Sequence, residues 1–303
     1  MRIASSLLAL GSSLSAISLD AQQMSGSSSM AHASHAIAVP DSVAKFASEA
    51  RAGIDAFRDR DAAIAAGYRR IGMDFPSMGE HWVNTSVLYR GVFDVATPAL
   101  LSYAVIDGRP VLTGAVYAVL LSPGELPPKV PGGIGKWHDH SGTLNDESAL
   151  PAHHGGMSDL SATRLLVLHA WVGVPNPDGL FEADNWALPY VRAGLPIPTP
   201  LSISAARALS LLSGAKDYYI ALGVAAGAKP GAVAPVLDSC ASLVTPIAAR
   251  MRASSQSAAM DIAALEDAWQ SAMEKIAIDA GPSVAARLNG GNLGGSDVSR
   301  QEF

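Results

Sequence analysis

The chain has 303 residues, of which 49% are hydrophobic and 16% are charged, and its formal net charge is −6. This composition excludes a largely disordered protein, because the chain has enough apolar side chains to bury a sizeable core. It also argues against a nucleic-acid partner, since no stretch gathers the lysines and arginines that would neutralise phosphates.

The first 21 residues have the pattern of an export signal. Arg2 supplies the positive start, Ile3 to Leu19 form an uncharged run rich in leucine, alanine and serine, and Ala21 closes a small-residue cleavage site. The run is short and rich in serine for a helix that spans a membrane. We therefore predict a periplasmic or secreted bacterial protein whose mature chain has no transmembrane segment.

Four further parts are predicted after this signal. Residues 22–40 are rich in serine, methionine, alanine and histidine, which is typical of a flexible linker. An α+β core is expected over residues 41–200 and a helical segment over 201–282. The remaining residues, 283–303, are predicted to form a disordered tail.

The core is predicted to begin with a helix from about residue 43 to 57, capped by Asp41 or Ser42, and a shorter helix over 60–68. Apolar side chains in the first helix recur every three or four residues, so they lie on one stripe. They are Phe46, Ala50, Ile54 and Phe57.

The apolar period then changes to that of strands, which are predicted over residues 79–83 and 99–106. Asp107 and Gly108 form a hairpin turn signal, so the chain is expected to return as a strand over 111–121. These runs are apolar on both faces, which is typical of strands that are covered on each side.

A long loop is predicted over residues 122–162, which are rich in proline and glycine, before another buried strand over 164–174. A proline-rich connector follows over 189–200. Three helical stretches then cover about 202–226, 232–254 and 258–279. The fold class is therefore α+β, with an N-terminal helix, a mainly antiparallel sheet or barrel-like core, and a helical C-terminal segment.

Three motifs follow one another in a fixed order between about residues 60 and 190. They are Met78-Gly79-Glu80-His81-Trp82-Val83-Asn84, Trp137-His138-Asp139-His140, and Leu168-His169-Ala170-Trp171 with Asn176-Pro177-Asp178-Gly179-Leu180-Phe181 after it. The set resembles a family of exported bacterial proteins whose activity is not established. The resemblance implies a shared site and no particular reaction.

Six of the eight histidines lie from His81 to His169, and four of the six belong to these tryptophan-containing motifs. Imidazole is the commonest transition-metal ligand in proteins. His138 and His140 are two residues apart and share a face wherever the chain is extended. We predict one transition-metal ion, zinc, copper or iron, in a partly hydrophobic pocket walled by Trp82, Trp137 and Trp171. Its predicted ligands are His81, His138, His140 and His169.

Two acidic residues adjoin predicted ligands. Glu80 precedes His81 and Asp139 separates His138 from His140, so both carboxylates point to the opposite face in a regular strand. Three roles are open for each of them. They can act as general bases, as hydrogen-bond acceptors that orient an imidazole, or as ordinary salt-bridge partners.

Two alternatives compete with a site made of all four histidines. His169 lies on an apolar strand, where a lone histidine can simply be a core residue. His153 and His154 lie in a glycine-rich stretch and could join His138 and His140 in a loop site.

Three functions fit this sequence. The first is a metalloenzyme with an open coordination position, acting on a small molecule. The second is a non-catalytic copper-binding protein, favoured by Met73, Met78 and Met157 and by the methionines of the linker. The third is a module that binds a small ligand or a partner and uses its histidines structurally.

Overall fold

The computed structural model describes residues 40–133, 136–140, 163–253 and 258–290. The predicted export signal, nearly all of the linker, and the loop histidines His153 and His154 lie outside these ranges. Residues 39–303 belong to one compact unit, which holds both the predicted core and the predicted helical segment.

The described secondary structure is as follows. The helices are α1 (Asp41–Ile54), the 3-10 helix η1 (Asp55–Arg58), α2 (Arg60–Ala65), α3 (Thr85–Leu88), α5 (Leu188–Arg192), α6 (Ile203–Ser210), α7 (Lys216–Ala225), α8 (Pro230–Ala253), α9 (Ala258–Ala280) and α10 (Pro282–Asn289). The strands are β1 (Arg69–Phe75), β2 (Gly79–Val83), β3 (Leu100–Ile106), β4 (Arg109–Leu121), β5 (His138–Asp139) and β6 (Arg164–Ala170).

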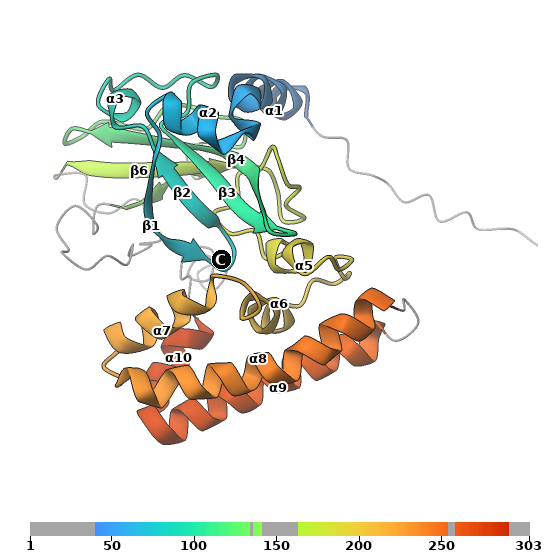
Figure 1. Ribbon diagram of the computed structural model, residues 1–303. Coiled ribbons are helices and arrows are strands. Elements are labelled where there is room, and N and C mark those ends of the chain that lie inside the picture. Colours follow the sequence, from blue (N-terminus) through green and yellow to red (C-terminus); the bar gives the residue numbers. More distant parts are fainter. Residues whose placement is uncertain (1–39, 134–135, 141–162, 254–257, 291–303) are drawn as a thin grey trace, which may run out of the picture. The chain divides into compact units, whose positions relative to one another are not determined.

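The six strands form one antiparallel sheet in the order β1-β2-β3-β4-β6-β5, curled into a half-barrel (Figure 1). The predicted α+β fold is therefore confirmed. Asp107 and Gly108 both have positive φ, 49° and 71°, as the predicted tight turn between β3 and β4 requires. Strand β1 was not predicted, because it begins with two arginines, contains a glycine and is largely exposed, which hides its period.

Helix α1 confirms the predicted apolar stripe, since Phe46, Ala50 and Ile54 are its buried residues. The predicted side-chain cap is wrong. The helix begins at Asp41 after Pro40, and no side chain caps it. An acidic residue in the first turn still interacts favourably with the helix dipole.

Two predictions for the C-terminal part also need correction. The connector over residues 189–200 contains most of α5, and the predicted tail over 283–303 begins with helix α10. Pro282 explains the second error. A proline ends a preceding helix but is favoured in the first turn of the next one, and Pro282 occupies that place in α10.

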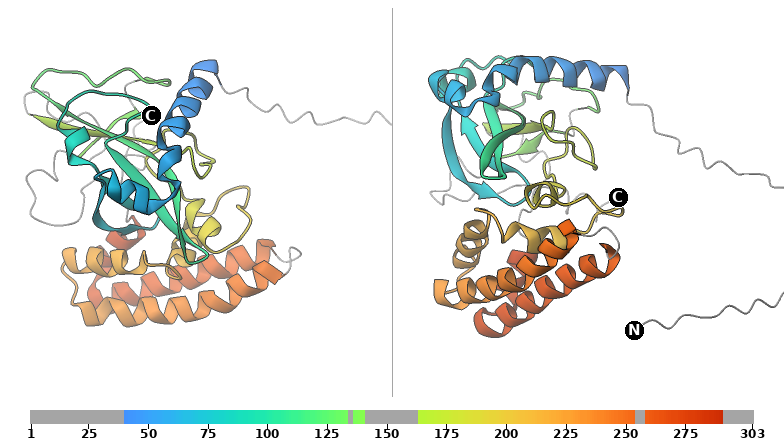
Figure 2. Two further views of the ribbon diagram at one scale, coloured as in Figure 1. Left: turned by 45° about the horizontal axis from the view of Figure 1, so that its top comes forward. Right: turned by 45° about the vertical axis from the view of Figure 1, so that its right-hand side comes forward.

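Two apolar cores join helices to the half-barrel. The first joins α1 to Trp82, Tyr103 and Tyr117 of the strands. The second joins α6–α10 to Phe75 at the end of β1 and to Trp171 after β6. In the right-hand view of Figure 2 the strands therefore lie between α1, in blue, and the C-terminal helices, in orange and red.

Helix α8 is the one described helix that is long and apolar enough to cross a membrane, by length and composition alone. Its buried residues, among them Val233, Leu237, Cys240 and Val244, belong to the core shared with α6, α7, α9 and α10. A core helix passes the same test, so the absence of a transmembrane segment from the mature chain stays a prediction.

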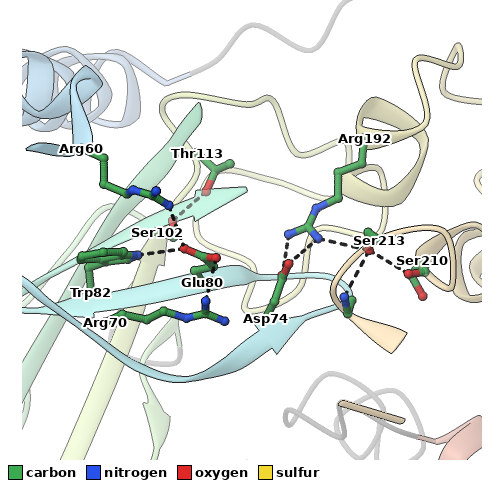
Figure 3. A network of polar contacts seen from close by, with 11 residues as sticks. Arg60, Arg70, Asp74, Glu80, Trp82, Ser102, Thr113, Arg192, Ser210 and Ser213 are labelled. Carbon is green, nitrogen blue, oxygen red and sulfur yellow. Dashed lines mark hydrogen bonds and ion pairs between the residues drawn. The ribbon is translucent and has the colours of Figure 1, made fainter. Parts of the chain in front are cut away.

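A buried ion pair joins the sheet to the helices. Arg192 of α5 donates to both carboxylate oxygens of Asp74 on β1, at 2.9 and 2.7 Å, and the two side chains are only 4% and 7% exposed (Figure 3). Ser213, between α6 and α7, accepts a further hydrogen bond from Arg192. This double contact fixes the end of β1 against the helical layer.

Candidate metal centre

The strand register decides which predicted ligands share a face of the sheet. Residues directly opposite one another on neighbouring strands point to the same side. His81 on β2 is opposite Ser102 on β3, and Ser102 is opposite Gly114 on β4. His169 on β6 is opposite Val116, two residues along from Gly114. His81 and His169 therefore lie on one side of the sheet, which we call the histidine face.

His138 belongs to the same face. It is opposite Val167 on β6, and Val167 is two residues from His169. His140 follows directly after β5, where its backbone N–H donates to the carbonyl of Leu165 at 2.7 Å. All four predicted ligands thus come from β2, β6 and the short segment around β5.

The four imidazoles lie close together. The ring centroids of His81 and His169 are 5.3 Å apart, those of His169 and His138 are 5.3 Å apart, and those of His138 and His140 are 4.9 Å apart. Imidazoles bound tetrahedrally to one ion at about 2.1 Å hold their ring centroids roughly 5 Å apart. Each of these three neighbouring pairs therefore has the spacing that two ligands of one ion can have.

The closeness of His81 to His169 depends on the curl of the sheet and on small residues between them. Strands β3 and β4 separate β2 from β6, which in a flat sheet would place the two backbones roughly 14 Å apart. On the histidine face the positions next to His81 are Ser102 and Gly114. A Cβ at Gly114 would lie 2.5 Å from the carbonyl oxygen of Ala170, so only glycine fits there.

The electrostatics of His81 agree with this grouping. Burial lowers the pKa of His81 from 6.5 to about 4, and repulsion by His140 acts in the same direction. Its imidazole is therefore neutral at physiological pH. Neutral imidazole has the free nitrogen lone pair that a metal ion needs.

Aromatic side chains from the core shared with α6–α10 lie next to the imidazoles. The ring centroids of Phe75 and His81 are 5.6 Å apart, and those of His169 and Trp171 are 5.8 Å apart. Met78, which is 1% exposed, belongs to the same apolar core as Phe75 and Trp171. The surroundings of the imidazoles are thus partly hydrophobic.

Two tryptophans predicted to wall the site lie elsewhere. Trp82 and Trp137 belong to the core under α1, on the opposite side of the sheet. Trp82 donates to Glu80 at 3.1 Å, and Trp137 donates to the carbonyl of Pro128 at 3.0 Å. The prediction was wrong because each is the sequence neighbour of a histidine, and neighbours in a strand point to opposite faces. Trp171, the third tryptophan predicted to wall the pocket, does contact His169.

The predicted acidic residues also point away from the imidazoles. Glu80 forms ion pairs with Arg70 at 3.0 Å and Arg60 at 3.6 Å (Figure 3). Of the three roles predicted for Glu80, its contacts support that of a salt-bridge partner. Asp139 is opposite Leu166, and its carboxylate is therefore on the face opposite His138.

A polar network holds the segments next to β5 and β6 together. Lys136, two residues before His138, pairs with Glu182 at 2.6 Å, and the Trp171 indole donates to the carbonyl of Glu182 at 2.7 Å. Asn176 forms the predicted turn by accepting from the backbone of Asp178. Glu182, the residue after the Asn176 to Phe181 motif, thus contacts both Lys136 and Trp171.

The donor atoms are not in place for a metal. Within the described ranges, no group of three or more histidine, cysteine, aspartate or glutamate side chains is arranged to hold a metal ion as it stands. The distances between ring centroids group the imidazoles but do not say where their nitrogens point. Binding of one ion would require some of the rings to turn.

Sequence reasoning missed the polar residues of the sheet next to His81. Ser102 is 1% exposed and Thr113 is fully buried, and the Thr113 hydroxyl donates to the Ser102 hydroxyl at 2.9 Å. Ser102 is the only serine of β3, and Thr113 is the only threonine of β4. An isolated aliphatic hydroxyl inside an apolar strand was the signal that could have found both.

Comparison of the chain with known protein families, with characterised proteins and with solved structures finds no significant match. The resemblance to a family of exported bacterial proteins therefore stays a prediction from the motifs. The function of the site has to be argued from its residues.

Proposed function

We propose that this chain is an exported protein that binds one transition-metal ion through His81, His138, His140 and His169. The observation that carries the proposal is the grouping of four imidazoles from three separate segments, in which the centroids of neighbouring rings are 4.9 to 5.3 Å apart. The proposed export rests on the pattern of the first 21 residues.

Burial of the group favours a ligand over purely structural histidines. His81, His138 and His169 are at most 9% exposed, and a polar ring is costly to bury. A metal ion shared by several imidazoles would bind one nitrogen of each ring. Histidines that are only core residues would have no reason to follow one another, ring against ring, from His81 through His169 and His138 to His140.

The proposed donors suit zinc, copper and iron, all of which accept imidazole. Three imidazoles around an ion would leave one tetrahedral position open for water or a substrate. Such a site would fit hydrolysis or hydration with zinc, or oxygen chemistry with copper or iron. Four imidazoles in a closed site would fit binding without catalysis.

The second candidate function is copper binding without catalysis. Met78 favours it, because its side chain is buried in the core that also holds Phe75 and Trp171, which contact His81 and His169. Thioether sulfur is a preferred ligand of Cu(I). A third candidate is a module that binds a small ligand or partner, in which the packing of His81 on Phe75 and of His169 on Trp171 makes both histidines structural.

Metal analysis of mature protein purified without a histidine tag tests the proposal. We expect about one ion per chain after exposure to zinc, copper or iron and removal of loosely bound metal. The variant H81A/H169A should lose it. The matched control is H32A/H35A, which removes two histidines from the predicted linker. A wild-type protein that takes up none of the three metals would show the proposal to be wrong.

A further inference from the structure

Ser102 is a buried hydroxyl on the histidine face, directly opposite His81. Its neighbour on the other side is Gly114, which has no side chain to cover it. Trp171, which follows β6, contacts His169. The hydroxyl of Ser102 therefore lies on the same face as the imidazoles, at the position next to His81.

The hydrogen bonds of Ser102 leave it with one free acceptor site. A serine hydroxyl has one proton to donate and two lone pairs that accept. Ser102 donates to the carbonyl of Gly114 at 3.3 Å. It accepts from Thr113 at 2.9 Å (Figure 3). No other described group donates to it. One lone pair remains, and the proton is already engaged.

A β-bulge produces this arrangement. The register of β3 and β4 shifts between Ser102 and Tyr103, so Thr113 is the extra residue on β4. Bulges redirect side chains and are frequent beside functional sites. Here the bulge brings two buried hydroxyls together, although an apolar pair would be cheaper to bury.

We propose that Ser102 accepts a hydrogen bond from a protonated ligand at an open coordination position of the metal, and thereby selects such ligands against anions that lack a proton. The ligand would be water or hydroxide in the resting protein. This inference rests on the proposed metal site. Its physical reason is that the free lone pair attracts an O–H group and repels an aprotic anion, while Gly114 and Thr113 prevent the hydroxyl from turning its proton toward the ligand.

The test compares bicarbonate with nitrate as ligands of the cobalt(II)-substituted full chain. Both are planar monoanions, but only bicarbonate carries a proton. We expect the wild-type protein to prefer bicarbonate, and S102A to reduce the ratio of the two dissociation constants by about tenfold, the value of one ordinary hydrogen bond. S102T keeps a hydroxyl and should retain most of the preference.

Y103F is the matched control. It removes a buried hydroxyl from the next residue of β3, which points to the opposite face and donates to the carbonyl of Phe57 at 2.7 Å. Its ligand preference should equal that of the wild type.

Three results would overturn the proposal. The first is an unchanged ratio in an S102A protein that keeps its metal and fold. The second is loss of metal from S102A but not from S102T, which would make Ser102 part of the metal site itself. The third is an equal change in Y103F. A wild-type protein without metal would remove the proposed function as well, so metal content is measured first.

Discussion

Glu80 and His81 are neighbours in the sequence, yet they lie in two different kinds of polar environment. In the polar network around Glu80 and Asp74, each carboxylate meets a cation, since Glu80 meets Arg60 and Arg70 and Asp74 meets Arg192. On the histidine face, imidazoles lie against other imidazoles. A carboxylate and an arginine stabilise each other within the fold. A group of imidazoles has no opposite charge among its members, and a shared metal ion would stabilise it most.

The largest effect on stability is expected from the buried ion pair between Asp74 and Arg192. D74A removes the partner of a guanidinium that is 4% exposed and should lower the free energy of unfolding by about 3–5 kcal/mol, because a buried charge is left uncompensated. The double variant D74A/R192M should recover much of the loss. Denaturant unfolding measures both. Equal stability of D74A and wild type would show that the ion pair does not hold the sheet to the helices.

The next effect concerns the pH dependence of the metal-free protein. The folded pKa of His81 is about 4, below its ordinary value of 6.5, so the unfolded chain binds a proton first as the pH falls. The contribution of neutral His81 to the free energy of unfolding is therefore fully present above pH 6.5. As the pH falls from 6.5 to 4 the free energy of unfolding decreases, by roughly 3 kcal/mol at most. The slope of stability against pH in this window should be smaller in H81Q. Parallel curves for wild type and H81Q would contradict a neutral, buried His81.

The two sides of the sheet should also differ in their effect on metal affinity. H169A should weaken binding by on the order of 10–100-fold or more, since the loss of a ligand costs at least as much as the loss of a residue that orients one. E80Q changes a carboxylate on the other side and should leave affinity unchanged. Competition with a chelator measures both variants. Full affinity in H169A would make His169 a core residue and reduce the site to three histidines.

The smallest effect is expected from the loop histidines. H153A/H154A should leave metal affinity at the wild-type value if the ion is held on the histidine face. A site built from the loop with His138 and His140 predicts the reverse, a large loss in H153A/H154A and none in H81A. The same competition assay decides between them.

Sequence patterns predicted the elements that are rich in apolar residues. Strands β2, β3, β4 and β6 and helices α6 to α9 are of this kind, whereas β1, with its arginines and glycine, is not. The patterns also named the four histidines. They could not predict that His81 meets His169 across two intervening strands, because this depends on the register, on the curl of the sheet and on the space left by Gly114.

Side-chain alternation along a strand is enough to correct two site predictions from the sequence alone. Trp82 and Trp137 adjoin His81 and His138, and adjacent residues of a strand cannot face the same pocket. The same rule places Glu80 behind the site, where Arg60 and Arg70 neutralise it. The rule gives the face of a residue but not its partners. The two arginines come from α2 and β1, and only the packing of these elements brings them to Glu80.

The most direct test of the account is X-ray absorption of the zinc-loaded mature protein. Shared binding by the histidine face predicts three or four nitrogen ligands at about 2.0–2.1 Å, with the outer-shell scattering of imidazole rings, and one fewer imidazole in H169A loaded with excess zinc. A shell of oxygen or sulfur ligands without imidazole scattering, or an unchanged number of imidazoles in H169A, would contradict it.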